Sequence, residues 1–312
     1  MIEVRNLTKR YGDTVAVDHL SFDVPPGLVT GFLGPNGAGK STTMRLILGL
    51  DAPSSGTATV LGHRYQDRRQ PLHDVGALLE ARGIHPGRSA RNHLLAMAQA
   101  DQIPHARVDE VIRLVGLETV ADKRAGGFSL GMNQRLGIAS ALLGDPQVLL
   151  LDEPVNGLDP EGIIWIRTLL RGLASEGRTV LLSSHLMSEM ALTADRLVVI
   201  GKGHLIAETT VDAFIRQSSG NRVRVRSPRT ADLVSALTNH ADDIEVRPDD
   251  AVIVTGLDCP AVATLASDAG VPVHELVAET ASLEDAYLEL TQDSVEYRPD
   301  GADTHLAALK TA

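Results

Sequence analysis

Short apolar runs alternate with helical patterns over the first two hundred residues. Val29–Leu33 and Val148–Leu151 are largely apolar runs of the length and character that strands show when a parallel sheet buries both of their faces. Val180–Leu182 and Leu197–Ile200 are similar, and a helical pattern over Ser41–Leu50 follows the first run. This alternation predicts an α/β domain.

A long helical stretch interrupts these strands between Pro86 and Gly144. Apolar residues recur there at the three- and four-residue spacing of one helix face, at Val108, Val111, Ile112, Val115 and Leu117. We interpret residues 86–144 as a helical insertion in the sheet-based domain.

The last ninety residues have an organisation of their own. The turn-rich segment Ser218–Asn221 is typical of a boundary, so we predict one domain over 1–220 and a second over 221–291, followed by a polar tail over 292–312 that we expect to fray. Pro248-Asp-Asp250 marks a hairpin in the second domain. The order β-α-β-β-α-β there is that of a small α+β, ferredoxin-like fold, with elements expected at Arg222–Arg226, Ala231–Leu237, Ile244–Arg247, Val252–Val254, Ala261–Ala269, Val271–Val277 and Ser282–Leu290.

Composition narrows the class of protein. The 312 residues carry a formal net charge of −11, and residues 221–312 hold 17 of the 40 acidic residues but only 7 of the 29 basic ones. A nucleic-acid partner requires a basic face, so we expect none. The chain has one cysteine, no apolar run of spanning length and no apolar segment at its start, which together predict a protein of a reducing, cytoplasmic compartment.

A phosphate-binding motif follows the first apolar run. Residues 34–41 read GPNGAGKS and fit G-x-x-x-x-G-K-[ST] between a strand and a helix. Glycines let backbone N–H groups converge on phosphate oxygens, the lysine reaches the β- and γ-phosphates, and the serine hydroxyl binds Mg²⁺. We therefore expect ATP at Gly34, Pro35, Asn36, Gly37, Ala38, Gly39, Lys40, Ser41 and Thr42, with Ser41 also on the metal.

Two carboxylates follow the buried run Val148–Leu151. In proteins with this phosphate loop an aspartate at a strand end holds Mg²⁺, which is the role expected of Asp152. Glu153 is then placed to act as general base toward the attacking water.

Further motifs give the chain a resemblance to the ATPases of ABC transporters. Residues 128–135, FSLGMNQR, resemble that family's signature sequence, residues 157–160 (GLDP) its D-loop, and Ser184-His185 its switch histidine. These motifs occur in the family's order across residues 1–210. The glycine loop alone is shared by many NTPases, but the signature segment narrows the choice.

The resemblance implies further roles at the site. Tyr11 stands where the family stacks an aromatic ring on adenine, and Ala16 falls on the same side of the nucleotide. Ser129 is expected to serve ATP held by a second copy, which implies a homodimer, and Gly131 and Asp159 are also expected to bind ATP. His185 is expected to hold the γ-phosphate or the water in place.

One position departs from the family pattern. Glu80 occupies the place of a glutamine that contacts Mg²⁺ and the lytic water, and Pro86 and Ser89 support this alignment. We expect Glu80 to keep a metal-binding and catalytic role, because some exporter-type members resemble this chain here.

The sequence thus predicts an ATP-hydrolysing subunit that binds ATP and Mg²⁺, works on the cytoplasmic face of the membrane and drives export through a separate permease. Residues 282–291 resemble the ending of stand-alone ATPase subunits of bacterial multidrug, antibiotic or lipid exporters. The permease is expected to dock near Ile84, His85 and Leu94. Two alternatives remain open: a soluble ABC ATPase acting on ribosomes or DNA, and a regulatory module that binds ATP without turnover.

Overall fold

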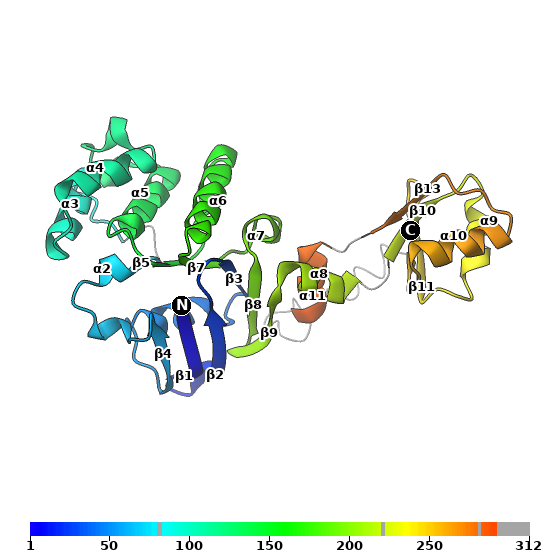
Figure 1. The fold of residues 1–312 in the computed structure, drawn as a ribbon, viewed down its shortest axis with the longest axis horizontal. Coiled ribbons are helices and arrows are strands. Elements are labelled where there is room, and N and C mark those ends of the chain that lie inside the picture. Colours follow the sequence, from blue (N-terminus) through cyan, green and yellow to red (C-terminus); the bar gives the residue numbers. More distant parts are fainter. Residues whose placement is uncertain (80–82, 220–221, 280–281, 292–312) are drawn as a thin grey trace. The chain divides into compact units, whose positions relative to one another are not determined.

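The computed structural model describes residues 1–79, 83–219, 222–279 and 282–291 (Figure 1). Within them the chain forms two compact units, Met1–Thr210 and Val211–Gln292. The division lies one helix earlier than the boundary expected at Ser218–Asn221.

A mostly parallel sheet is the centre of the first unit. Its strand order is β5-β6-β7-β3-β8-β9, with antiparallel pairing only between β8 and β9. The apolar runs expected at Val29–Leu33 and Val148–Leu151 are confirmed as β3 and β6, and both are buried throughout. The remaining strands are β5 (Val75–Leu78), β7 (Thr179–Ser183), β8 (Arg196–Gly201) and β9 (His204–Thr210).

The strand order decides where functional residues meet. Because β7 lies between β6 and β3, and these three strands are parallel, their carboxyl ends lie at one edge of the sheet. The glycine loop after β3, Asp152 after β6 and Ser183 at the end of β7 therefore share that edge.

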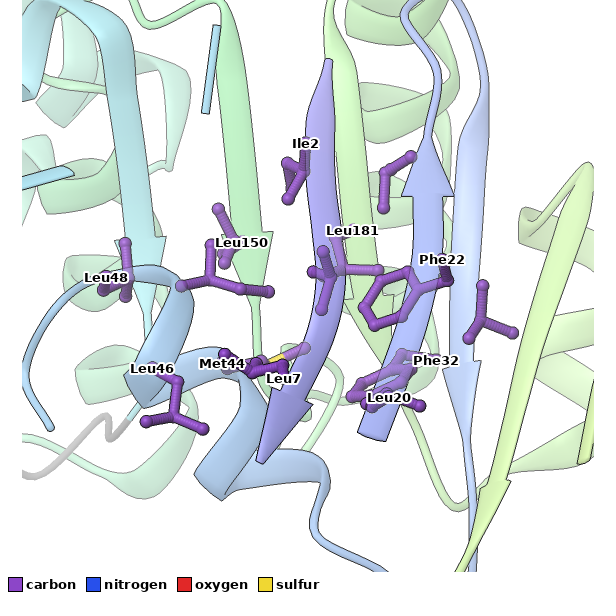
Figure 2. Packing of buried hydrophobic residues seen from close by; sticks show 14 of the residues in the cluster. Ile2, Leu7, Leu20, Phe22, Phe32, Met44, Leu46, Leu48, Leu150 and Leu181 are labelled. Carbon is purple, nitrogen blue, oxygen red and sulfur yellow. The ribbon is translucent and has the colours of Figure 1, made fainter. Parts of the chain in front are cut away.

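A second, antiparallel sheet covers the core. It has the order β2-β1-β4, from β1 (Ile2–Tyr11), β2 (Thr14–Val24) and β4 (Ser55–Val60). Figure 2 shows side chains from this sheet, the parallel sheet and helix α1 (Lys40–Ile47) packed together, with Phe22 stacked on Phe32 at 5.4 Å between ring centroids. Helix α1 is thereby fixed to the core through Met44, Leu46 and Ile47.

The expected helical insertion is present as α3 (Ala90–Ala100), α4 (His105–Leu114) and α5 (Leu130–Leu142), with 3-10 turns at Glu118–Val120 and Ala125–Gly127. Leu94 is fully buried, whereas Ile84 is half-buried and His85 exposed. The expectation that Leu94 faces a partner is wrong, because its side chain is part of the insertion's core. The first unit is completed by α2 (Pro71–Asp74), α6 (Pro160–Ser175), α7 (Met187–Thr193) and a 3-10 turn at Tyr65–Asp67.

The second unit has a four-stranded antiparallel sheet of order β11-β12-β10-β13. Together with its two helices this is the β-α-β-β-α-β order expected of a ferredoxin-like fold. The elements are β10 (Arg222–Arg226), α9 (Thr230–Leu237), β11 (Asp243–Val246), β12 (Val252–Thr255), α10 (Cys259–Asp268) and β13 (Glu275–Ala278). The same unit contains α8 (Val211–Ser219) and α11 (Leu283–Thr291), which pack against each other.

Candidate nucleotide site

The glycine loop forms an open hollow at the carboxyl edge of the parallel sheet. Its lining is made by Ala16, by the loop and helix start from Pro35 to Thr42, and by Asp152 and Glu153. Gly39 precedes α1 with φ +98°, and a Cβ there would lie 2.4 Å from the carbonyl oxygen of Ala16. Gly34 is equally constrained, because its Cβ would lie 2.6 Å from the carbonyl oxygen of Ile200. Only glycine fits at these two positions. Because glycine has no side chain, the backbone of the loop can approach a ligand in the hollow closely.

Lys40 lies in this hollow with its ammonium partly buried. Its Nζ donates to the carbonyl oxygens of Gly34 at 2.6 Å and Pro35 at 3.2 Å. Burial lowers the pKa of Lys40, while Glu153 and Asp152 act to raise it. A desolvated ammonium with only two carbonyl acceptors is stabilised by an anion such as a phosphate.

Asp152 is held by two hydroxyl groups, one from the start of α1 and one from the end of β7. Ser41 Oγ donates to Asp152 Oδ2 at 2.8 Å, and Ser183 Oγ donates to Asp152 Oδ1. A hydroxyl beside a carboxylate is the donor set that Mg²⁺ takes when nucleotide phosphates and waters supply its other ligands. No group of three or more His, Cys, Asp or Glu side chains that could hold a metal occurs in the described residues.

The side chain of Glu153 is hydrogen-bonded to His185, the residue expected to be the switch histidine. His185 Nδ1 lies 2.8 Å from Glu153 Oε2, and the His185 backbone N–H donates to the same oxygen at 3.3 Å. Since an ionised carboxylate can only accept, the proton of the shorter bond belongs to His185. The structure thus brings together Ser41, Asp152, Ser183, Glu153 and His185 in one hydrogen-bonded series.

The signature and D-loop residues lie on other elements. Ser129 Oγ caps α5 by accepting from Met132 N at 3.2 Å, and Asp159 Oδ1 caps α6 by accepting from Gly162 N at 2.9 Å. The two segments touch, since a Cβ on Gly131 would lie 2.7 Å from the carbonyl oxygen of Gly157. Neither Ser129 nor Asp159 lines the hollow at the glycine loop of its own chain.

Tyr11 ends β1 with its side chain exposed to 47%, so it is not a core tyrosine. Its hydroxyl donates to Asp51 Oδ2 at 2.9 Å, and the Lys9 ammonium lies 4.8 Å from the ring centroid. Arg45, on α1, also bonds this carboxylate, and together with Tyr11 it lowers the pKa of Asp51 to about 2. The ring is thereby tied to the helix that follows the glycine loop.

Two contributors to the site were missed by sequence reasoning. Ser183 contacts both Asp152 and Glu153, and Gln134 Nε2 donates to the Glu153 carbonyl oxygen at 3.1 Å. Two features of the sequence could have pointed to them: Ser183 directly precedes Ser184-His185, and Gln134 lies within the signature segment. Glu80 lies outside the described residues, and its expected role stays a prediction.

Known proteins with the same features identify the family. The sequence profile described as ABC transporter matches residues 17–156. The bacitracin transport ATP-binding protein BcrA of Bacillus licheniformis is 43% identical over 215 residues, 68% of this chain and 70% of that protein. The Nod factor export ATP-binding protein I of Burkholderia lata is 36% identical over 298 residues, 93% of this chain and 96% of that protein. The chain belongs to the ABC transporter ATP-binding proteins.

The structural comparison agrees with this assignment. A solved ATP-binding subunit of an ABC transporter matches the ABC ATPase described here with a TM-score of 0.64 at 28% identity, over 70% of this chain and 92% of that one. A second profile, a domain of unknown function, matches residues 221–284. Among the described helices, none is both long and apolar enough to cross a membrane.

Proposed function

We propose that two copies of this ABC ATPase close around two ATP·Mg²⁺, hydrolyse the ATP, and so drive export through a separate membrane permease. The observation that carries the proposal is the hydrogen-bonded series from Ser41 through Asp152, Ser183 and Glu153 to His185 at the mouth of the glycine loop. It joins a hydroxyl and a carboxylate suited to Mg²⁺ to a second carboxylate and an imidazole, which are suited to activating and positioning a water.

Binding rests on the loop and on Tyr11. The N–H groups of residues 34–42 and the start of α1 hold the phosphates, and Lys40 neutralises the β- and γ-phosphate charge. Ser41 and Asp152 would hold Mg²⁺, which would neutralise phosphate charge when bound, and Glu80 would be a further ligand. Tyr11 stacks on the adenine beside Ala16.

Hydrolysis rests on Glu153 and His185. Glu153 accepts the proton of the attacking water as general base. His185 fixes the position of that water or of the γ-phosphate through its imidazole, contributing geometry rather than proton transfer. Glu80 assists at the metal and the water.

Completion of the site requires a second copy. Ser129, Gly131 and Asp159 lie off the hollow of their own chain, and the start of α5 offers a serine hydroxyl and helix N–H groups suited to an anion. These residues bind the γ-phosphate held by the opposite subunit, so hydrolysis depends on closure of the homodimer.

The names of two relatives support the proposed direction of transport. Two relatives at 36–43% identity are named for bacitracin transport and Nod factor export. We infer that this ABC ATPase also serves export. We further infer that it attaches to the cytoplasmic face of the membrane, with a permease as its partner and no nucleic acid. Ile84 and His85 remain the residues we assign to the permease contact.

The Glu153→Gln variant tests the catalytic proposal. It removes the base and keeps the phosphate loop, so ATP binding should persist while phosphate release falls by at least about a hundredfold. The ATP-loaded variant should run as a dimer by light scattering, and the ATP-free variant as a monomer. Near-normal turnover would exclude Glu153 as the base.

A separate experiment tests the transport proposal. The tagged chain is purified from membranes together with a polytopic subunit, and the purification is repeated with Ile84→Asp and with His204→Asp as an exposed control on β9. Association should be lost only in Ile84→Asp. A chain that never leaves the soluble fraction would contradict the permease partnership.

A further inference from the structure

Glu153 has a backbone conformation that residues other than glycine rarely adopt. Its φ of +52° lies in the left-handed region, where a non-glycine residue persists only if its surroundings hold it. The residue begins the loop after β6, so its φ and ψ decide where its carboxylate points. Whatever holds this backbone therefore sets the position of the general base.

Two buried side chains hold the two ends of that residue. Ser183 Oγ accepts from the Glu153 N–H at 3.0 Å, and Gln134 Nε2 donates to the Glu153 carbonyl oxygen at 3.1 Å. Ser183 is fully buried and Gln134 is 3% exposed. Ser183 belongs to the sheet, but Gln134 belongs to α5, the helix that Ser129 caps.

We propose that Gln134 is a positioning residue that holds the backbone of Glu153 and couples the signature helix to the general base of its own chain. The inference rests on the proposed function, in which Ser129 acts on the opposite subunit's nucleotide. The same helix then serves two sites: its capping residue Ser129 serves the partner's nucleotide, and its buried glutamine serves its own. A shift of α5 on dimer closure moves the Glu153 carbonyl with it.

The neighbouring amide shows that this contact is particular to Gln134. Asn133 Nδ2 donates to the carbonyl oxygens of Phe128 at 3.3 Å and Ser129 at 3.2 Å, both at the start of its own helix. The carboxamides of these two adjacent residues on α5 thus donate to different segments of the chain. Asn133 supports the signature segment, and Gln134 crosses to the loop after β6.

Single substitutions in the full-length protein give the first test. Gln134→Met keeps the length of the side chain and removes the donor. We expect kcat to fall by about tenfold to a hundredfold, as small misplacements of catalytic groups do, with KM for ATP changed by less than about twofold. Leu136→Met, a volume-conserving change at another buried position of α5, should leave kcat within about twofold, and the Tm of both variants checks folding. Unchanged kcat in folded Gln134→Met overturns the proposal.

Mixed dimers separate this role from that of the signature. One chain carries Lys40→Ala, so the single working site uses the glycine loop and Glu153 of the other chain and the signature of the Lys40→Ala chain. Gln134→Met should reduce turnover only when placed in the chain with the intact Lys40. Asn133→Leu and Ser129→Arg should do so only in the Lys40→Ala chain.

The outcomes distinguish the two proposals. Equal loss from Gln134→Met in either chain would mean that it acts through packing of α5, and the coupling proposal fails. If Ser129→Arg is harmful only in the chain with intact Lys40, the composite site fails, while the kcat and KM result for Gln134→Met still decides whether that residue positions Glu153.

Discussion

At the scale of single residues, the chemistry depends on side chains that never touch the nucleotide in the proposed mechanism. Ser183 joins Asp152 to the backbone of Glu153, and Asp51 joins Tyr11 to Arg45. Such partners fix an exposed functional group by hydrogen bonds to rigid elements. An exposed ring or carboxylate would otherwise lose much of its effect to side-chain freedom.

The hydrogen bond that holds the Tyr11 ring to Asp51 gives a prediction about nucleotide affinity. Tyr11→Ala removes the ring, and base–aromatic stacking contributes about 1–3 kcal/mol, so KM for ATP should rise about fivefold or more while kcat changes little. Tyr11→Phe keeps the ring and loses the bond to Asp51, so its KM should lie between that of wild type and that of Tyr11→Ala. Steady-state kinetics of the three proteins checks this order, and a fall in kcat at constant KM contradicts stacking.

Glu80 gives a second prediction at this scale. Glu80→Gln keeps the side-chain length and restores the residue that the family pattern has at this position. ATPase activity should stay within about tenfold, or about 1.4 kcal/mol of the barrier. A loss of several orders of magnitude in phosphate release would show that the carboxylate itself takes part in the chemistry.

At the scale of elements, the sequence predicted strands best where both faces are buried. Val29–Leu33 and Val148–Leu151 match β3 and β6, because strands whose two faces are both buried in a parallel sheet are largely apolar along their length. The strand expected over Val271–Val277 is only Glu275–Ala278 in the structure, since Pro272 lacks the N–H that a ladder needs. The antiparallel sheet β2-β1-β4 escaped prediction because register shifts interrupt the alternation along β1.

The candidate site was predictable where a motif is continuous, and unpredictable where partners come from distant elements. Lys40, Asp152 and His185 follow strands whose order the sequence does not state. Only the position of β7 between β6 and β3 brings Ser183 to both carboxylate-bearing residues. The contact of Gln134 with Glu153 needs the packing of α5, which no local pattern encodes.

The glycine loop gives a prediction at this scale. Gly39→Ala places a Cβ 2.4 Å from the carbonyl oxygen of Ala16 at φ +98°, so the loop must distort and ATP binding should be lost. Gly172→Ala is the matched control, because a Cβ there meets nothing within 4 Å inside α6. It should raise the free energy of unfolding by about 0.5–1 kcal/mol and leave binding unchanged. Nucleotide titration and urea unfolding of both variants provide the comparison.

At the scale of the whole molecule, every proposed nucleotide residue belongs to the first unit. The second unit contributes none of them and carries most of the net negative charge, so we expect it to adjust closure or turnover rather than binding. Its boundary matters for any truncation. Helix α8 packs against α11 and therefore belongs with the second unit, although most of it lies before the boundary expected at Ser218–Asn221.

Two truncations therefore have different expected outcomes. A chain ending at Thr210 removes α8 and α11 together and should fold and bind ATP with the affinity of the intact protein. A chain ending at Gly220 keeps α8 without the helix it packs against, and α8 presents Val211 and Phe214, which are 6% and 3% exposed in the intact chain. That product should bind ATP but aggregate more readily. Light scattering and nucleotide titration on both fragments make the comparison, and loss of ATP binding in the fragment ending at Thr210 would show that the first unit does not fold alone.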